Sequence, residues 1–271
     1  MTAAPTPADR GEPEVLVLPD GEVASTVAAR RIAAALTAAV DARGVAHWAT
    51  TGGSTPGPIY RDLAREPLHD SVPWDRVHLW WGDDRWVAPD NPLSNALACW
   101  DLLLREVPMP TANVHVVPIG EAMAGGHPPA WAAARYAEEL RSAALPLAAS
   151  GFPILDVVLV GIGSDGHLFS VFPDSATWGN PAWAQAVPAP THIAPRVERI
   201  TLHPWMLDAA RLAMVVTYGA AKAEIVGRIF GRRVDPRALP GQLARRSGVV
   251  WILDEAAALS LPPHLGRTSP A

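Results

Sequence analysis

The sequence has almost no cysteine and almost no lysine. Its 271 residues include one cysteine, Cys99, and one lysine, Lys222. A single cysteine excludes an internal disulfide, and without a second thiol or a tight histidine cluster nearby Cys99 predicts core packing instead of a metal site. Because the other basic residues are all arginines, Lys222 is a candidate for a place where a compact ammonium is needed. The alternative, an ordinary surface lysine, stays open.

Long apolar runs and basic clusters are also missing. No uninterrupted apolar stretch approaches the ~20 residues that a membrane span requires. The N-terminal stretch MTAAPTPADRGEP lacks the basic start and apolar region of a signal peptide. A net charge of −5 without a lysine and arginine run argues against a nucleic-acid surface. We therefore expect a cytoplasmic protein with a small-molecule partner, no membrane or nucleic-acid partner, and a monomeric or weakly homodimeric state.

Short apolar runs alternate with helical segments along the chain. The helical segments, such as 22–44 and 128–145, carry apolar residues at i, i+3 and i+4 spacing. This alternation predicts an α/β fold with a single-domain, Rossmann-like, doubly wound and mostly parallel sheet that has helices on both faces. The runs that predict buried strands are 15–18, 47–50, 77–81, 114–117, 155–160, 212–218 and 249–253.

The composition is uniform enough to predict one domain, residues 12–262, with flexible tails at 1–11 and 263–271. Two stretches rich in proline and glycine, 118–129 and 173–195, predict long loops. Neither stretch separates regions of different composition, so neither is a domain boundary.

Ligands of parallel sheets bind where loops leave the carboxyl ends of the strands. After the run 47–50 comes TGGSTPGPIY, in which Gly52 and Gly53 let the backbone approach a ligand and Ser54 and Thr55 offer hydroxyls. Pro56 suits the first turn of a helix, and backbone N–H groups at a helix start bind phosphate. The alternative is a plain glycine turn with a helix cap.

Charged residues lie at the ends of three further predicted strands. Asp83, Asp84 and Arg85 gather after the run 77–81 and are candidates for a site wall, the alternative being a solvated loop. Arg199 begins a short predicted strand in RITL, and Lys222 lies at a strand-to-helix turn. Both cations could join the phosphate loop, although each alone is more often a surface charge.

The stretch VLVGIGSDGHLFSVFP, from Val158 to Pro173, has the Gly-x-Gly-x-x-Gly spacing of dinucleotide-binding turns. That fingerprint needs a long helix after the third glycine and an acidic residue ~20 positions further on. Pro173 interrupts any such helix, and residues 180–190 contain no acid. We therefore expect no nucleotide cofactor.

What remains in this stretch is the pair Asp165 and His167, held on a glycine loop at the end of a central strand. An imidazole titrates near neutrality, and a neighbouring carboxylate can fix its tautomer and raise its basicity. Other histidines, such as His47, His78 and His115, lie in or beside predicted strands, where a structural role is expected.

Taken together, TGGSTP, GDDRWVAPDNPLSN, VGIGSDGHLFSVFP, RITL and GAAKA, in this order, resemble the 6-phosphogluconolactonase family over roughly residues 15–260. The related glucosamine-6-phosphate deaminases/isomerases share the phosphate loop and the Asp-Gly-His loop, but they carry a glutamate where this chain has Phe172, which cannot transfer a proton. His167, Ser170, Phe172 and Pro173 match the lactonase loop. The departures from the family pattern, which put the fine shape of the pocket in doubt, are Leu168, Phe169, Asp84 and Thr51.

The resemblance implies hydrolysis of 6-phospho-D-glucono-1,5-lactone to 6-phosphogluconate, the second step of the oxidative pentose phosphate pathway, without a metal or cofactor. His167 would act as general base, Asp165 would orient it, and Arg85 would stabilise the oxyanion. Asp83 would line the sugar hydroxyls or organise Arg85. Two alternatives stay open: a glucosamine-6-phosphate deaminase/isomerase and a non-catalytic sugar-phosphate-binding protein. The residues implied to hold the phosphate are Gly52, Gly53, Ser54, Thr55, Arg199 and Lys222.

Overall fold

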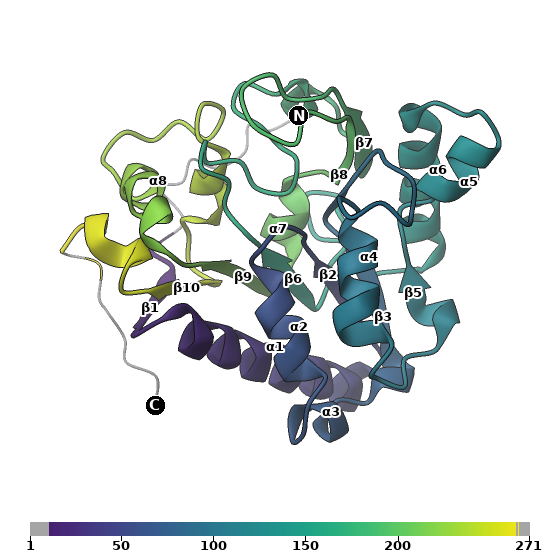
Figure 1. Ribbon diagram of the computed structural model, residues 1–271, viewed down its shortest axis with the longest axis horizontal. Helices are drawn as coiled ribbons and strands as arrows, with labels where there is room; N and C mark the ends of the chain where they lie inside the picture. The colour runs from purple at the N-terminus through teal and green to yellow at the C-terminus, as the bar shows by residue number, and fades with distance from the viewer. Residues whose placement is uncertain (1–10, 264, 266–271) are drawn as a thin grey trace.

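Seven strands form one sheet in the order β1-β10-β9-β6-β2-β3-β5, which runs from left to right in Figure 1. In the computed structural model, which describes residues 11–263 and 265, every neighbouring pair of these strands is parallel. The seven predicted apolar runs all contribute to this sheet, although the run 114–117 forms only two residues of strand. The strands are β1 (Glu14–Leu18), β2 (Ala46–Thr50), β3 (Val77–Trp81), β5 (Val114–His115), β6 (Val157–Val160), β9 (Leu212–Thr217) and β10 (Val249–Asp254).

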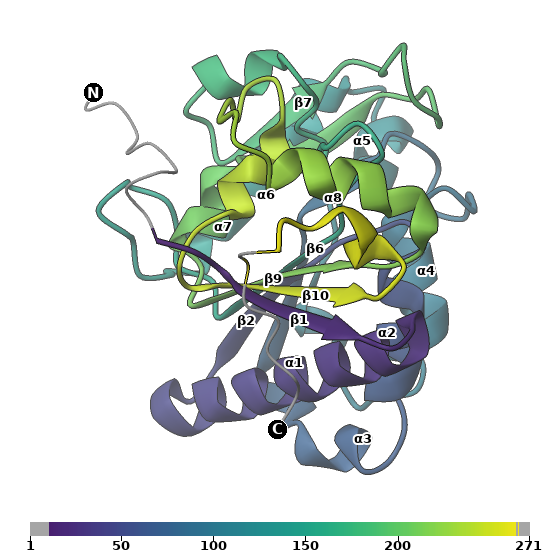
Figure 2. The same cartoon turned by 90° about the vertical axis from the view of Figure 1, so that its left-hand side faces the viewer.

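Helices cover both faces of this sheet (Figure 2), which confirms the predicted doubly wound α/β fold. Successive strand residues point to opposite faces, so that Trp48 packs in one hydrophobic cluster and Ala49 in the other. One face carries α1 (Gly21–Arg43), α2 (Pro56–Leu63), α3 (Leu68–Ser71) and α4 (Asn95–Cys99), and the other carries α6 (Pro129–Ser142), α7 (Trp205–Ala209) and α8 (Ala223–Ile229). Cys99 lies buried in the first cluster, as predicted.

The longest helix, α1, has clear start and stop signals. The Asp20 carboxylate accepts a hydrogen bond from the Val23 N–H, and Gly44 ends the helix in the left-handed conformation with φ of 77°. With 23 residues, α1 is long and apolar enough to span a membrane by length and composition alone. Its buried stripe, which includes Ile32 and Leu36, packs in the core cluster on one face of the sheet, as in a core helix.

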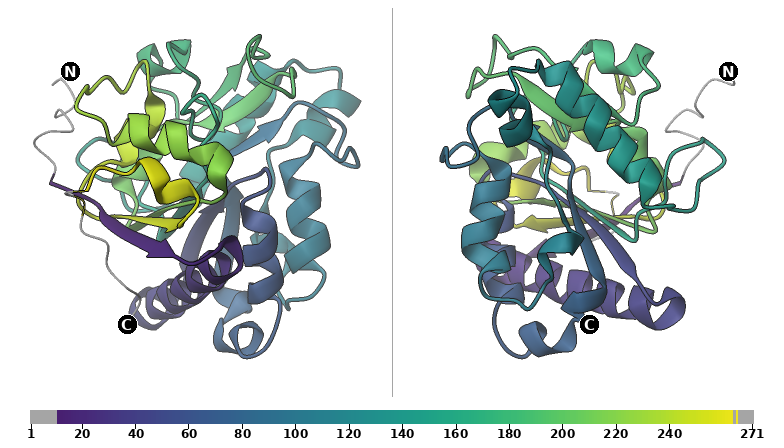
Figure 3. Two further views of the ribbon diagram at one scale, coloured as in Figure 1. Left: turned by 60° about the vertical axis from the view of Figure 1, so that its left-hand side comes forward. Right: turned by 90° about the vertical axis from the view of Figure 1, so that its right-hand side faces the viewer.

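A second, antiparallel sheet has the order β4-β8-β7. Its strands are β4 (Asp83–Arg85), β8 (Arg199–Leu202) and β7 (Ala184–Val187), and α6 lies against it (Figure 3). The sequence predicted β8 but was wrong to treat 83–85 and 173–195 as loops without strands. It also missed α5 (Ile119–Ala124) within the stretch 118–129. These elements are short, and β4 and β7 are strands only because each pairs with β8.

At the centre of the parallel sheet, between β2 and β6, the order in which the chain adds strands changes direction. From β2 the chain continues to β3 and β5 on one side, whereas from β6 it continues to β9 and β10 on the other. Because β2 and β6 are neighbours, the loops at their carboxyl ends diverge and open a crevice, the usual ligand position in such sheets. The predicted tails at 1–11 and 263–271 fall almost wholly outside the described residues.

Candidate active site

The loop after β2, residues 51–55, presents backbone donors to this crevice. The N–H groups of residues 52–55 make no hydrogen bond to any described residue. Thr55 precedes α2, and its side chain makes no capping bond. A Cβ on Gly52 would lie 1.7 Å from Asn95 Oδ1, and Gly53 has a φ of 84°, so both positions require glycine. Free N–H groups at a helix start form a binding site for an anion.

The loop after β6 holds Asp165 and His167 together. His167 Nδ1 lies 2.6 Å from Asp165 Oδ1, which also accepts the His167 backbone N–H at 3.1 Å. An ionised carboxylate only accepts hydrogen bonds, so Nδ1 carries the proton and Nε2 keeps a free lone pair in the neutral ring. Gly163 makes this approach possible, because a Cβ there would lie 2.1 Å from Nδ1. His167 therefore has the tautomer of a general base.

The electrostatics of Asp165 favour its ionised form. Burial opposes ionisation, but hydrogen bonds from His167 and His192, together with the charge of His167, hold the pKa of Asp165 well below its usual range. His192 is a site residue that the sequence reasoning missed. Its Nε2 lies 2.7 Å from Asp165 Oδ2, 27 positions along the chain, and no motif connects the two residues.

Two arginines enter the site from neighbouring strands of the small sheet. Arg85 on β4 pairs in register with Arg199 on β8. Arg85 donates to the Leu93 carbonyl and Arg199 to the Pro195 carbonyl, each at 2.8 Å. The Nε atom of each arginine is buried without a hydrogen-bond partner among the described residues. Burial, with a smaller contribution from Arg85, lowers the pKa of Arg199 although nearby carboxylates oppose this.

The two aspartates of β4 point in opposite directions. Asp83 lines the same pocket as Arg85 and accepts a hydrogen bond of 2.6 Å from Ser170 Oγ. Asp84 instead binds the backbone N–H groups of Arg85 and Asn95 at 2.8 and 2.7 Å, and burial raises its pKa to about 6. Asp84 thus fixes the segment that carries Arg85 and Asn95.

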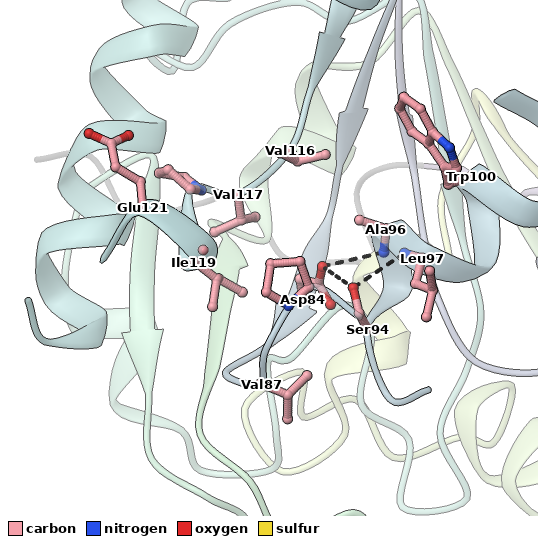
Figure 4. Close-up of a pocket in the computed structure, with 13 residues that line it drawn as sticks. Asp84, Val87, Ser94, Ala96, Leu97, Trp100, Val116, Val117, Ile119 and Glu121 are labelled. Carbon is pink, nitrogen blue, oxygen red and sulfur yellow. Dashed lines mark hydrogen bonds between the residues drawn. The ribbon is translucent and has the colours of Figure 1, made fainter. Parts of the chain in front are cut away.

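On the Asp84 side lies a second, mainly apolar pocket of about 400 Å³ (Figure 4). Its walls come from residues 84–100 and 116–121, and none of the residues predicted to bind substrate or act in catalysis lines it. There Asp84 also accepts hydrogen bonds from Ser94 Oγ at 3.4 Å and the Ala96 N–H at 3.3 Å.

Lys222 reaches the crevice from the turn after β9. Gly219 opens this turn with a φ of 92°, and its N–H donates to the Asp254 carboxylate at 2.9 Å. The Lys222 ammonium donates to the Ile162 carbonyl at 2.7 Å. Burial lowers the pKa of Lys222, and the charge of Asp165 partly offsets this. The one lysine of the chain is thus held beside the loop that carries His167.

These loops enclose one cavity of about 390 Å³. Asp165 does not line this cavity but binds His167, which does. Asp84, also a candidate for the site wall, lines the second pocket instead, so its placement in the site wall was wrong, whereas the other predicted site residues line the cavity. Within residues 11–263 and 265, no group of three or more His, Cys, Asp or Glu side chains could hold a metal ion. The sequence reasoning did not single out Asn95, Ile193 or Ala194, which also line the cavity, as does Phe169, one of the departures from the family pattern. The predicted residues on its wall are Gly52, Gly53, Ser54, Thr55, Asp83, Arg85, His167, Arg199 and Lys222.

Comparisons with known proteins identify relatives of this chain. Residues 19–252 match the family described as glucosamine-6-phosphate isomerases/6-phosphogluconolactonase. A 6-phosphogluconolactonase of Synechocystis is 32% identical over 261 residues, which cover 93% of this chain and 99% of the relative. A 6-phosphogluconolactonase of Mycobacterium tuberculosis is 33% identical over 248 residues, which cover 91% and 97%.

Among solved structures, the 6-phosphogluconolactonase of Trypanosoma brucei is similar with a TM-score of 0.79 and 27% identity, covering 93% of this chain and all of the other. A monomeric glucosamine-6-phosphate deaminase has a TM-score of 0.73 at 18% identity, covering 91% and 99%. The second likeness shows a shared fold alone.

Proposed function

The chain belongs to the family of glucosamine-6-phosphate isomerases and 6-phosphogluconolactonases, and from this premise we propose that it hydrolyses 6-phospho-D-glucono-1,5-lactone to 6-phospho-D-gluconate. The names of its relatives support this reaction, and with it the second step of the oxidative pentose phosphate pathway. The observation that carries the proposal is the pair Asp165 and His167, which faces a cavity with two arginines and a lysine.

His167 is the general base. Asp165 binds Nδ1, so Nε2 is the atom that takes a proton from water as the water oxygen attacks C1 of the lactone. The tetrahedral intermediate collapses by breaking the bond between C1 and the ring oxygen. His167 returns its proton to that oxygen, which becomes a hydroxyl of the product. Asp165 stays ionised and stabilises the imidazolium formed between the two steps.

Arg85 stabilises the oxyanion. Its Nε is a buried donor without a partner among the described residues, and such a donor is ready for the charge that develops on the carbonyl oxygen. Asp83 shares the pocket but is bound to Ser170, a fixed position from which it can accept a hydrogen bond from a sugar hydroxyl.

The phosphate binds at the loop 52–55, with Arg199 and Lys222. The loop supplies free N–H groups and hydroxyls, and the two cations supply charge. Because the lactone ring is neutral, binding energy from the distant phosphate positions it against His167. As proposed, the reaction uses neither a metal nor a cofactor, and a cytoplasmic location stays a prediction.

Phe172 favours the lactonase over the deaminase reaction. Its ring centroid lies 4.8 Å from that of His167, and the Arg199 guanidinium lies over it at 5.5 Å. An apolar ring therefore occupies the place at which the resemblance puts the deaminase glutamate. It supplies no carboxylate for the ring-opening proton transfers of an amino sugar.

One assay separates the candidate functions. Purified protein is mixed with freshly generated 6-phosphogluconolactone at slightly acidic pH, where spontaneous opening is slow, and acid release is followed. A lactonase releases acid far above background, whereas a deaminase instead releases ammonia from glucosamine 6-phosphate. A non-catalytic protein does neither and only binds 6-phosphogluconate. Absence of acid release above background contradicts the proposed function.

A further inference from the structure

His192 reaches back to the catalytic pair from the segment between β7 and β8. Its Nε2 lies 2.7 Å from Asp165 Oδ2, while His167 Nδ1 lies 2.6 Å from Oδ1. The Asp165 side chain is 15% exposed and that of His192 is 47% exposed. The carboxylate is therefore held between two imidazoles, one on each oxygen.

No other described residue donates a hydrogen bond to Asp165 Oδ2. The cations that face Asp165 are engaged elsewhere: Lys222 donates to the Ile162 carbonyl and Arg199 to the Pro195 carbonyl. They act on Asp165 through charge alone. The orientation of the carboxylate thus depends on the two histidines.

Phe172 fills the space beside the two imidazoles. Its ring centroid lies 4.8 Å from that of His167 and 5.8 Å from that of His192, edge to face with the latter. The charged and titratable groups around Asp165 are therefore His167, His192, Arg199 and Lys222.

We propose that His192 is a positioning residue for the reaction. By holding Oδ2, it keeps Oδ1 in line with His167 Nδ1, a geometry that the carboxylate loses when it can rotate freely about its own bond. This role rests on the proposed function of His167 as the base. A donor bound to an ionised carboxylate makes one of the stronger hydrogen bonds in proteins.

Two substitutions test this role. His192→Gln keeps a hydrogen-bond donor for Asp165 Oδ2, so turnover stays close to that of the parent. His192→Leu removes the donor, and kcat falls roughly 10-fold. KM changes less, because the Arg199 guanidinium still binds the Pro195 carbonyl. This bond holds the segment with Ile193 and Ala194 in the cavity wall. His69→Gln, at a partly exposed histidine bound to Asp70, is the matched control with parental kinetics.

The contact between His167 Nδ1 and Asp165 is also measured without turnover, from the NMR signal of the Nδ1 proton, which His192→Gln keeps and His192→Leu loses. This readout keeps the two proposals distinguishable, because a parent protein that fails to hydrolyse the lactone contradicts the proposed function while the NMR signal still tests the positioning of Asp165. Parental kcat in His192→Leu, a loss that His192→Gln shares, or an unchanged Nδ1 proton signal in His192→Leu overturns the positioning role.

Discussion

Arg85 and Arg199 stand directly opposite each other on the antiparallel strands β4 and β8. Like charges in this position destabilise a sheet, and the Nε atom of each is buried without a partner among the described residues. Buried donors usually have a hydrogen-bond partner, so two unpaired Nε atoms in one cavity indicate that a ligand binds there. A ligand that brings an anionic group to each guanidinium would offset the repulsion and engage the unpaired donors.

Ligand binding should therefore stabilise the fold through Arg199. We expect 6-phosphogluconate, the stable product, to raise Tm in a concentration-dependent way. In Arg199→Met its Kd should be at least ~10-fold weaker, because charge-assisted hydrogen bonds are lost. Thermal unfolding across a ligand series measures this, with exposed Arg30→Met on α1 as the control. Equal Kd values in parent and Arg199→Met would show that Arg199 does not hold the ligand.

Lys222 should contribute to substrate binding and little to the chemical step. Lys222→Met should raise KM for the phosphorylated lactone ~10-fold or more with little change in kcat, because a uniform binding interaction is lost. Glucono-1,5-lactone, which lacks the phosphate, is the internal control and should be turned over equally by both proteins. A loss confined to kcat would argue against a pure phosphate-binding role.

Gly163 should be irreplaceable because of its contact with His167. In Gly163→Ala the new methyl would lie 2.1 Å from Nδ1, so the imidazole must leave Asp165. We expect turnover to fall ~100-fold, the scale of a lost general base, with the circular dichroism spectrum preserved. Gly179→Ala is the matched control, since a Cβ there meets nothing within 4 Å. Turnover within a few-fold of the parent in Gly163→Ala would mean that this close approach is not needed.

His203, which does not line the cavity of the site, should make stability depend on pH. Its Nδ1 accepts the Trp205 N–H at 3.2 Å, and burial lowers its pKa to about 4. The folded state thus binds fewer protons than the unfolded state between pH ~6.5 and ~4. The free energy of unfolding should fall by up to about 1.4 kcal/mol per pH unit on acidification in this window.

Urea unfolding at pH 7 and pH 5 measures the contribution of His203. His203→Asn, whose side-chain oxygen can still accept the Trp205 N–H, should show a smaller loss of stability between the two pH values than the parent. The buried His47, whose pKa is also lowered to about 4, keeps part of the dependence in both proteins. Identical losses in the two proteins would rule out the assigned role of His203.

The parallel sheet could be predicted because its strands are buried on both faces and form continuous apolar runs. The strands of the small sheet lack this signal. β4 is the polar sequence Asp83-Asp84-Arg85, and it becomes a strand only through pairing with Arg199 and its neighbours on β8. Such pairing is a tertiary interaction that a local pattern does not contain.

The sequence predicted those site residues that occupy loops at the ends of strands. Gly52, His167 and Lys222 each follow a predicted strand, and the parallel sheet brings these loops to one edge. Asn95 and His192 lie in no such position. Asn95 is placed by the Asp84 carboxylate and His192 by Asp165. These contacts join residues 11 and 27 positions apart, and no motif in the sequence indicates them.

The most direct measurement is the turnover of freshly generated 6-phosphogluconolactone by His167→Ala, compared with the parent and with His127→Ala at an exposed histidine. Acid release is followed at slightly acidic pH against the spontaneous rate. With His167 as general base, kcat falls ~100-fold or more and binding of 6-phosphogluconate is kept, while His127→Ala matches the parent. Parental turnover in His167→Ala would contradict the mechanism.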